Sequence, residues 1–124
     1  MQKILDQLVE NVKEGIPGYI AISIAEMASG ESLISDSNNP NFDPALASAY
    51  NVEILNSKRK AIEALELKEE IKDVYFNLKN QIHIINLSPS GEYFIYLAVD
   101  SKKANLALTR TLLNRYKKDL DNEL

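Results

Sequence analysis

Residues 81–99, QIHIINLSPSGEYFIYLAV, contain two apolar segments joined by a turn-forming sequence. Both faces of the first segment are apolar, with Ile82 and Ile84 on one face and Ile85 and Leu87 on the other. The second segment, residues 92–99, is also apolar on both faces. Ser-Pro-Ser-Gly between them favours a tight turn, and strands with two apolar faces are typical of sheets covered on both sides. The stretch therefore predicts a central hairpin with helices on both faces.

Three more segments have the pattern of strands. Residues 71–78 alternate in polarity, and Lys79-Asn80 can turn the chain into the central hairpin. Residues 19–25 alternate isoleucine with alanine or serine, which indicates that their small-residue face is closely covered. Residues 31–36 have the pattern of a returning strand after the turn signal Ser29-Gly30. Two hairpins joined through a helix predict one five-stranded, mostly antiparallel sheet.

Two helices are predicted before the central hairpin. Residues 2–14 repeat apolar side chains at helical spacing, and a Gly/Pro-rich sequence ends the pattern. A second helix begins at Asp43-Pro44, where Asp43 is a suitable N-cap and Pro44 occupies the first helical position. Its apolar periodicity extends to about Leu65.

A last helix follows the central hairpin, and we expect Asp100 or Ser101 to cap it. The apolar positions predicted to face the sheet are Ala104, Ala107, Leu108, Leu112 and Tyr116. Residues 119–124 are expected to fray. The element order is then α-β-β-α-β-β-β-α, which predicts an α/β fold: a three-layer sandwich that occupies residues 1–124 as a single domain.

The middle helix has a broader apolar surface than one sheet requires. One stripe contains Leu46, Tyr50, Ile54, Ala61 and Leu65. Further apolar positions lie to the side of this stripe, at Val52, Leu55 and Ile62. A helix that packs on one sheet needs an apolar stripe only about 100° wide. The excess width predicts a second contact surface on this helix.

Composition excludes several classes of protein. The chain has no cysteine, so disulfides, thiol nucleophiles and cysteine-based metal sites are excluded. The formal net charge of −4 gives no general attraction to nucleic acid. The N-terminal sequence lacks the apolar core of a signal peptide, and no apolar run is long enough to span a membrane. We therefore predict a cytoplasmic protein that does not insert into membranes.

The sequence contains no motif of a catalytic, metal or cofactor site. His83 is the only histidine, and its position within a strand predicts a packed or hydrogen-bonded residue and not a ligand. No nucleophile elbow, P-loop or dinucleotide-binding glycine motif is present. The oxygen-rich residues 36–43 lack the glycine and glutamate of a calcium-binding loop. We expect no catalytic residues, no metal and no cofactor, and therefore no enzymatic activity.

Three local sequences, in this order and at this chain length, resemble the roadblock (dynein light chain) family. Residues 15–22 read GIPGYIAI, a proline-glycine step before an isoleucine-rich strand, and residues 29–33 place a glycine in the first hairpin turn. The strand ending YLAVD at residues 96–100 precedes Asn-Leu-Ala-Leu at residues 105–108 and Arg110. One departure is an alanine at residue 107, where the family commonly has glycine. Both residues are small enough for the close helix–sheet contact expected there.

The resemblance implies a dimeric scaffold or regulator in signalling, one that binds a Ras-like small GTPase or a motor complex; bacterial members resemble the activating partner of a polarity GTPase. In the family, the middle helix packs on its dimer mate, and the third strand pairs across the two-fold axis. The resemblance leaves open whether the mate is a second copy or a different chain. The expected interface residues are Leu46, Tyr50, Ile54, Leu55, Lys58, Arg59, Ile62, Val74, Tyr75 and Asn77. Tyr50 and Tyr75 are favoured because tyrosine is enriched at interfaces.

Two alternatives remain open at the level of sequence. A profilin-like or longin-like sensor would hold a small ligand or peptide in a pocket of one protomer, with His83 and Asn86 as polar lining. A chain that stimulates a GTPase catalytically would use an arginine against the phosphoryl charge. Arg59 on the middle helix is the more accessible candidate for that role, and Arg110 is expected to be structural.

Overall fold

Five strands form one antiparallel sheet in the computed structural model, which describes residues 2–123 except for the side chains of residues 119, 122 and 123. The strands occur in the order β2-β1-β5-β4-β3 across the sheet. Their bounds are Tyr19–Glu26 for β1, Ser32–Ser37 for β2, Asp73–Asn77 for β3, Gln81–Leu87 for β4 and Tyr93–Asp100 for β5. Each predicted strand is present within two residues of its expected bounds. The last strand of the chain lies at the centre of the sheet.

The central hairpin pairs β4 with β5 in the register Ile84 to Leu97. Gly91 ends the turn between the two strands with φ +76, a conformation that favours glycine. Its N–H donates to the carbonyl of Ser88 at 2.9 Å. The turn predicted from Ser-Pro-Ser-Gly is therefore confirmed.

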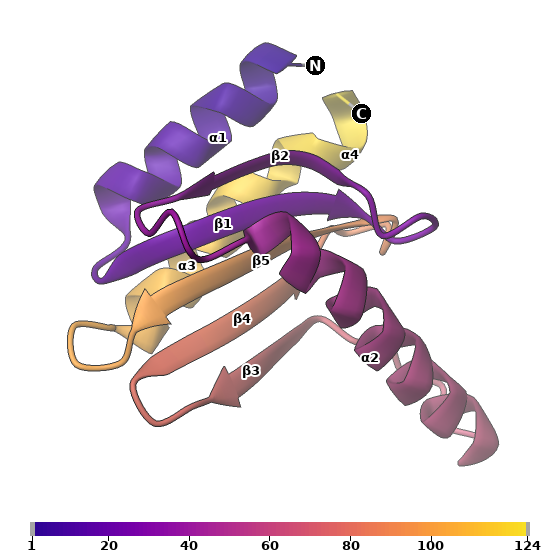
Figure 1. Cartoon of the computed structure of the whole chain (residues 1–124). Coiled ribbons are helices and arrows are strands. Elements are labelled where there is room, and N and C mark those ends of the chain that lie inside the picture. Colours follow the sequence, from indigo (N-terminus) through magenta and orange to yellow (C-terminus); the bar gives the residue numbers. More distant parts are fainter. Residues whose placement is uncertain (1, 124) are drawn as a thin grey trace.

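Helices cover both faces of the sheet, which confirms the three-layer prediction (Figure 1). Helices α1, Gln2–Gly15, and α3, Leu106–Tyr116, lie on one face. Helix α2, Pro44–Ala64, lies on the other. A 3-10 turn, η1, Lys117–Asp119, and a short helix α4, Leu120–Glu123, follow α3. Within residues 2–123, no helix combines the length and the apolar composition that a membrane crossing requires.

The face under α1 and α3 contains the larger apolar cluster. Isoleucine and leucine side chains of the three central strands meet Leu5 and Val12 of α1 and Leu113 of α3, and these three residues are at most 1% exposed. Leu120 of α4 is also fully buried in this cluster. The expectation that residues 119–124 fray is not met at Leu120, whose apolar side chain is removed from water; residue 124 lies outside the described residues.

The face under α2 is built from smaller side chains. Ala21, Ser23 and Ala25 of β1 are all fully buried, which confirms the close approach predicted for that face. Ser23 exchanges a hydrogen bond of 2.8 Å with the hydroxyl of Ser32 on β2. Leu55 of α2 is fully buried and packs with β-strand residues of this face. One helix therefore covers this face, and only its first half reaches the sheet's centre (Figure 1).

The start of α3 differs from the prediction. Its N-cap is Asn105, whose side chain accepts a hydrogen bond from the N–H of Leu108 at 3.0 Å. Asp100 caps only a turn, in which its carboxylate accepts from the N–H of Lys102 at 2.9 Å. Because aspartate, serine and asparagine are similarly good N-caps, local sequence does not distinguish these positions.

The later start also changes which side of α3 faces the sheet. Thr109, Leu112 and Leu113 are its buried residues, whereas Ala107 and Leu108 are exposed. Ala107 therefore does not make the close contact with the sheet that we expected of a small residue at this position. Ala104 and Tyr116 are half-buried and pack against the larger cluster as predicted.

Candidate partner-binding surfaces

Helix α2 carries an apolar stripe that the protomer does not cover. Leu46, Tyr50 and Ile54 occupy successive turns and are 57%, 62% and 44% exposed. The buried side of α2 contains Ser48 and Leu55 instead. At about 100° per residue, the stripe lies roughly 120° around the helix from the buried side. The second contact surface predicted from the breadth of the apolar pattern is therefore present as an exposed surface.

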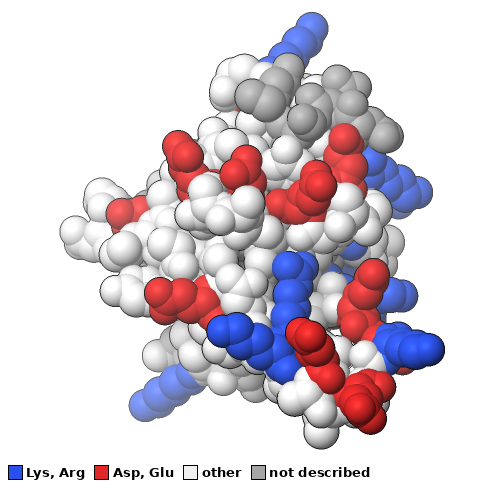
Figure 2. All heavy atoms as spheres, turned by 90° about the vertical axis from the view of Figure 1, so that its right-hand side faces the viewer, with Lys and Arg blue, Asp and Glu red and all other residues white. Residues whose placement is uncertain are grey.

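The second half of α2 extends beyond the sheet (Figure 1). The helix has 21 residues, which corresponds to about 31 Å at 1.5 Å per residue. From residue 56 to residue 70, every side chain is exposed except Ile62, which is half-buried. Basic and acidic side chains are interspersed over the side of the molecule toward which this half projects (Figure 2). This half contributes little to the apolar core of its own protomer.

Strand β3 is an edge of the sheet. It has five residues and pairs with β4 alone among the described strands. Val74 and Phe76 face the α2 side and are half-buried, and Asn77 is exposed. An edge strand presents backbone groups that can pair with a strand of another chain. The edge of β3 and the α2 stripe are two exposed features of the protomer.

The structure separates the ten residues predicted for the interface. Leu46, Tyr50 and Ile54 form the stripe, and Lys58 is exposed near it. Leu55 is fully buried against the sheet of its own protomer, so it has no surface to offer a partner. The remaining residues lie away from the stripe: Val74, Tyr75 and Asn77 on β3, and Arg59 and Ile62 in a cleft.

Tyr75 points to the opposite face of the sheet from Val74. It packs against the cluster under α1 and α3, and its hydroxyl is buried with no partner among the described atoms. Burial, then the charge of Asp73, raise the pKa of this hydroxyl, and Arg110 opposes them. Tyr75 thus presents little side-chain surface beside the α2 stripe.

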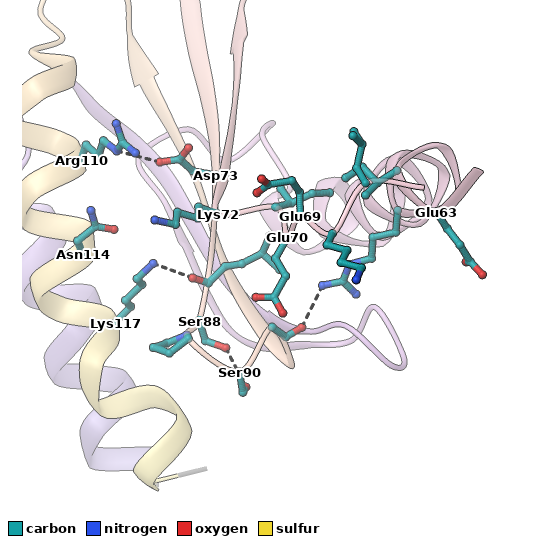
Figure 3. Close-up of a pocket in the computed structure, with 18 residues that line it drawn as sticks. Glu63, Glu69, Glu70, Lys72, Asp73, Ser88, Ser90, Arg110, Asn114 and Lys117 are labelled. Carbon is teal, nitrogen blue, oxygen red and sulfur yellow. Dashed lines mark hydrogen bonds and ion pairs between the residues drawn. The ribbon is translucent and has the colours of Figure 1, made fainter. Parts of the chain in front are cut away.

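A cleft of about 1240 Å³ opens between the projecting end of α2 and helix α3 (Figure 3). Segment 67–73 forms one side, and the β4–β5 turn, residues 88–91, closes one end. Arg59 crosses toward this turn, where its guanidinium donates to the carbonyl of Gly91 at 3.4 Å. Ser90 of the same turn donates its N–H to the carboxylate of Asp121 at 2.8 Å. Arg59 of α2 and Asp121 of α4 therefore both form hydrogen bonds with the β4–β5 turn.

Basic groups dominate the α3 wall of the cleft. Arg110 pairs with Asp73 at 3.1 Å, as expected of a structural arginine. Lys117 donates to the backbone carbonyl of Leu87 at 2.8 Å. Burial, followed by the positive charges of Lys72 and Arg110, lowers the pKa of the Lys117 ammonium, while the negative charge of Asp73 opposes the shift. The ammonium of Lys117 is therefore close enough to four other charged side chains to be influenced by them, namely Lys72, Asp73, Arg110 and Asp121.

His83 is a hydrogen-bonded residue, as predicted. Its Nε2 lies 2.8 Å from Oε1 of Gln81, and its Nδ1 lies 3.0 Å from the hydroxyl of Tyr96. Its ring makes edge contacts with Phe42 and Tyr96, and burial lowers its pKa. Asn86, the other residue expected to line a sensor pocket, lies on the opposite face of the sheet, where it contacts Asn114. His83 and Asn86 therefore do not line a common pocket. Within residues 2–123, no three His, Asp or Glu side chains are grouped as metal ligands.

The basic wall of the cleft is the feature that sequence reasoning missed. Lys72, Arg110 and Lys117 come from segments more than 30 residues apart, and each segment alone resembles a solvated surface. The one available signal is the spacing of Arg110, Asn114 and Lys117, which places three donors on one side of a helix. Only the fold shows that this side faces a cleft.

Comparison with solved structures identifies the fold. The sequence matches no protein-family model and no curated protein. A roadblock/LC7 domain from Streptomyces avermitilis superposes with a TM-score of 0.82 at 12% identity, over 95% of each chain. The gliding protein MglB from Thermus thermophilus gives a TM-score of 0.77 at 12% identity, over 96% of this chain and 86% of that chain. MglC from Myxococcus xanthus gives 0.62 at 22% identity, over 98% of this chain and 99% of that chain. The chain therefore has the roadblock fold expected from its sequence.

Proposed function

We propose that this chain, which has the roadblock fold, is a non-catalytic subunit that forms a two-fold dimer and, as a dimer, binds a Ras-like small GTPase. The observation that carries the proposal is the apolar stripe of Leu46, Tyr50 and Ile54, which stays exposed in a protomer that also has an open edge at β3. The proposal covers assembly and partner binding, and it assigns no chemical step to this chain.

A two-fold axis would satisfy both exposed features at once. In an isologous dimer the same patch occurs on both subunits, so the stripe would pack on its own copy. The two β3 edges would then pair, which would remove an open edge from each sheet. Complete burial of a side chain such as leucine contributes roughly 1.5–3 kcal/mol. Three such residues per subunit are a substantial driving force for assembly.

The GTPase partner is supported by the family resemblance, and the structural neighbours include a gliding protein, MglB. The chain has no phosphate-binding loop of its own, so it would act on a nucleotide bound to another protein. Both candidate arginines are engaged within the protomer, Arg59 with Gly91 and Arg110 with Asp73. Their engagement favours regulation or tethering over direct contact with a phosphoryl group.

Solution mass is the first test of assembly. Light scattering at several concentrations is expected to give a stable mass near twice 13.9 kDa. Ile54→Glu should reduce that mass to one chain at micromolar concentration, because a charge in an apolar interface stays unpaired. Leu108→Glu is the matched control, since Leu108 is a leucine of α3 with 40% exposure, close to the 44% of Ile54. A dimeric Ile54→Glu variant would exclude the α2 stripe as the interface.

The partner is tested separately. Immobilised wild-type chain is incubated with purified Ras-like GTPases of the same genome, each loaded with GDP or with a non-hydrolysable GTP analogue. Binding that depends on the nucleotide state and is lost with Ile54→Glu supports a dimeric regulator. If no such GTPase binds in either state, the dimer stands and the GTPase assignment is wrong.

A further inference from the structure

The cleft beside α3 is lined by charged side chains of both signs, and basic groups dominate its α3 side. Lys72, Arg110 and Lys117 lie on its α3 side, whereas Glu69 and Glu70 lie on the side toward α2 (Figure 3). Apart from the Arg110–Asp73 pair, no ion pair involves these five side chains among the described residues. Lys117 donates to a neutral carbonyl and forms no ion pair among the described residues, although the charges of Asp73 and Asp121 act to raise the pKa of its ammonium. Both walls thus retain charge that a ligand can complement.

The α3 wall presents hydrogen-bond donors. Asn86 is fully buried, and its side-chain nitrogen donates to Oδ1 of Asn114 at 3.2 Å. Because that oxygen is engaged, the amide nitrogen of Asn114, a residue that lines the cleft, is the group left to donate. Arg110 and Asn114 of α3 and Lys117 of η1 lie on one side of this helical segment, and all three line the cleft. A wall of donors, two of them cationic, is suited to an anionic acceptor.

The rest of the cleft favours a polypeptide over a small molecule. Ile62, Leu67 and Ile71 line it, and Leu67 is 51% exposed, so a large apolar side chain is uncovered at its edge. Its volume of about 1240 Å³ exceeds the roughly 300–1,000 Å³ typical of small-molecule sites. Apolar contacts between two charged walls match an extended segment that carries both kinds of side chain.

We propose that this cleft binds an extended segment of a partner protein. An anionic side chain of the segment lies against Lys72, Arg110, Asn114 and Lys117, and its apolar side chains lie against Leu67 and Ile71. Guanidinium and ammonium donors at this wall form charge-assisted hydrogen bonds with the anion. The site uses the side of α2 that carries Ile62, and it includes no residue of the Leu46–Tyr50–Ile54 stripe. It therefore does not overlap the α2 stripe of the proposed dimer, and Asp73 at the start of β3 is the one β3 residue that lines it.

The test is a nuclear magnetic resonance titration of the ¹⁵N-labelled full chain. Three of the probes are peptides with blocked termini. Each has two adjacent central residues flanked by leucines, and these two residues are both glutamate, both glutamine or both lysine. Inorganic phosphate is the fourth probe. The glutamate peptide should give saturable shifts confined to residues 67–73, 87–91 and 110–117. The glutamine peptide should bind about tenfold or more weakly, because a charged acceptor contributes roughly 1.5–3 kcal/mol.

A charge exchange makes the test specific. Lys72→Glu should weaken binding of the glutamate peptide and strengthen binding of the lysine peptide. Lys79→Glu makes the same charge change in the β3–β4 turn and should alter the binding of neither peptide. Ile54→Glu should retain the peptide shifts, which separates this site from the proposed dimer. The proposal is overturned if the glutamate peptide gives no saturable shift up to about 10 mM. Phosphate binding as tightly as that peptide, or equal effects of Lys72→Glu and Lys79→Glu, would also overturn it.

Discussion

The two faces of the sheet differ in how completely the protomer covers them. Helices α1 and α3, together with Leu120, enclose one face, and its central side chains are almost entirely buried. Helix α2 alone covers the other face, and Val74 and Phe76 at its edge remain half-buried. The enclosed face therefore supplies most of the stability, and the partly covered face leaves the α2 stripe and the β3 edge exposed.

The largest expected effect compares one buried leucine from each face. Leu113→Ala, on α3, should lower the free energy of unfolding by about 3–5 kcal/mol, and Leu55→Ala, on α2, by about 2–3 kcal/mol. Both side chains are fully buried, but a cavity under α2 can collapse more easily because one helix covers it. Urea denaturation of the two variants measures the difference. Equal losses would mean that the two faces are equally rigid.

Loss of the N-cap of a helix should lower the free energy of unfolding by a similar amount on either face. Asp43 accepts from the N–H of Leu46 at 3.1 Å at the start of α2, as Asn105 does for α3. Asp43→Ala and Asn105→Ala should each cost about 1 kcal/mol, because capping is local and independent of the layer that the helix covers. The same denaturation assay applies. A much smaller loss for Asp43→Ala would show that the start of α2 is already frayed in the wild type.

A smaller effect, of opposite sign, is expected where α2 ends. Glu66 has φ +59, a left-handed conformation that side chains disfavour, and its N–H bonds to the carbonyl of Glu63. Glu66→Gly should raise the free energy of unfolding by roughly 0.5–1 kcal/mol, since glycine adopts this conformation without steric cost. Glu63→Gly, inside the helix, should lower it by about 1 kcal/mol. Thermal denaturation of the two variants measures both changes in stability, an increase for Glu66→Gly and a decrease for Glu63→Gly.

The smallest expected effect is a pH dependence on the α2 face. Burial lowers the pKa of His83, so the unfolded chain binds its proton more readily than the folded chain. The free energy of unfolding should then fall as pH decreases through the ordinary histidine value of about 6.5. His83→Gln should flatten this slope between about pH 7.5 and 5.5, where carboxylates change little. An unchanged slope in that variant would assign the dependence to another group.

The strands are predictable because alternation places successive side chains on opposite faces without reference to distant residues. The start of α3 is not predictable, because Asp100 and Asn105 are both good caps and the packing of Thr109 and Leu113 selects between them. Burial therefore decides a choice that local sequence leaves open.

The exposed stripe of α2 is predictable only in part. The breadth of the apolar pattern indicates two contact surfaces, but it does not show that Leu55 belongs to the inner one. That assignment depends on how the helix is rotated about its axis. The basic wall of the cleft depends on the placement of α3 beside residue 72, which only the fold establishes.

The central position of β5 determines when this chain can fold during translation. Residues 93–100 join the β1–β2 hairpin to the β3–β4 hairpin. Until they leave the ribosome, two isolated hairpins exist, and single hairpins are marginally stable in water. Their open edges are then available to other nascent chains. The risk of aggregation therefore lasts until residues 93–100 have emerged, and a product terminated before residue 93 has no route to the native sheet.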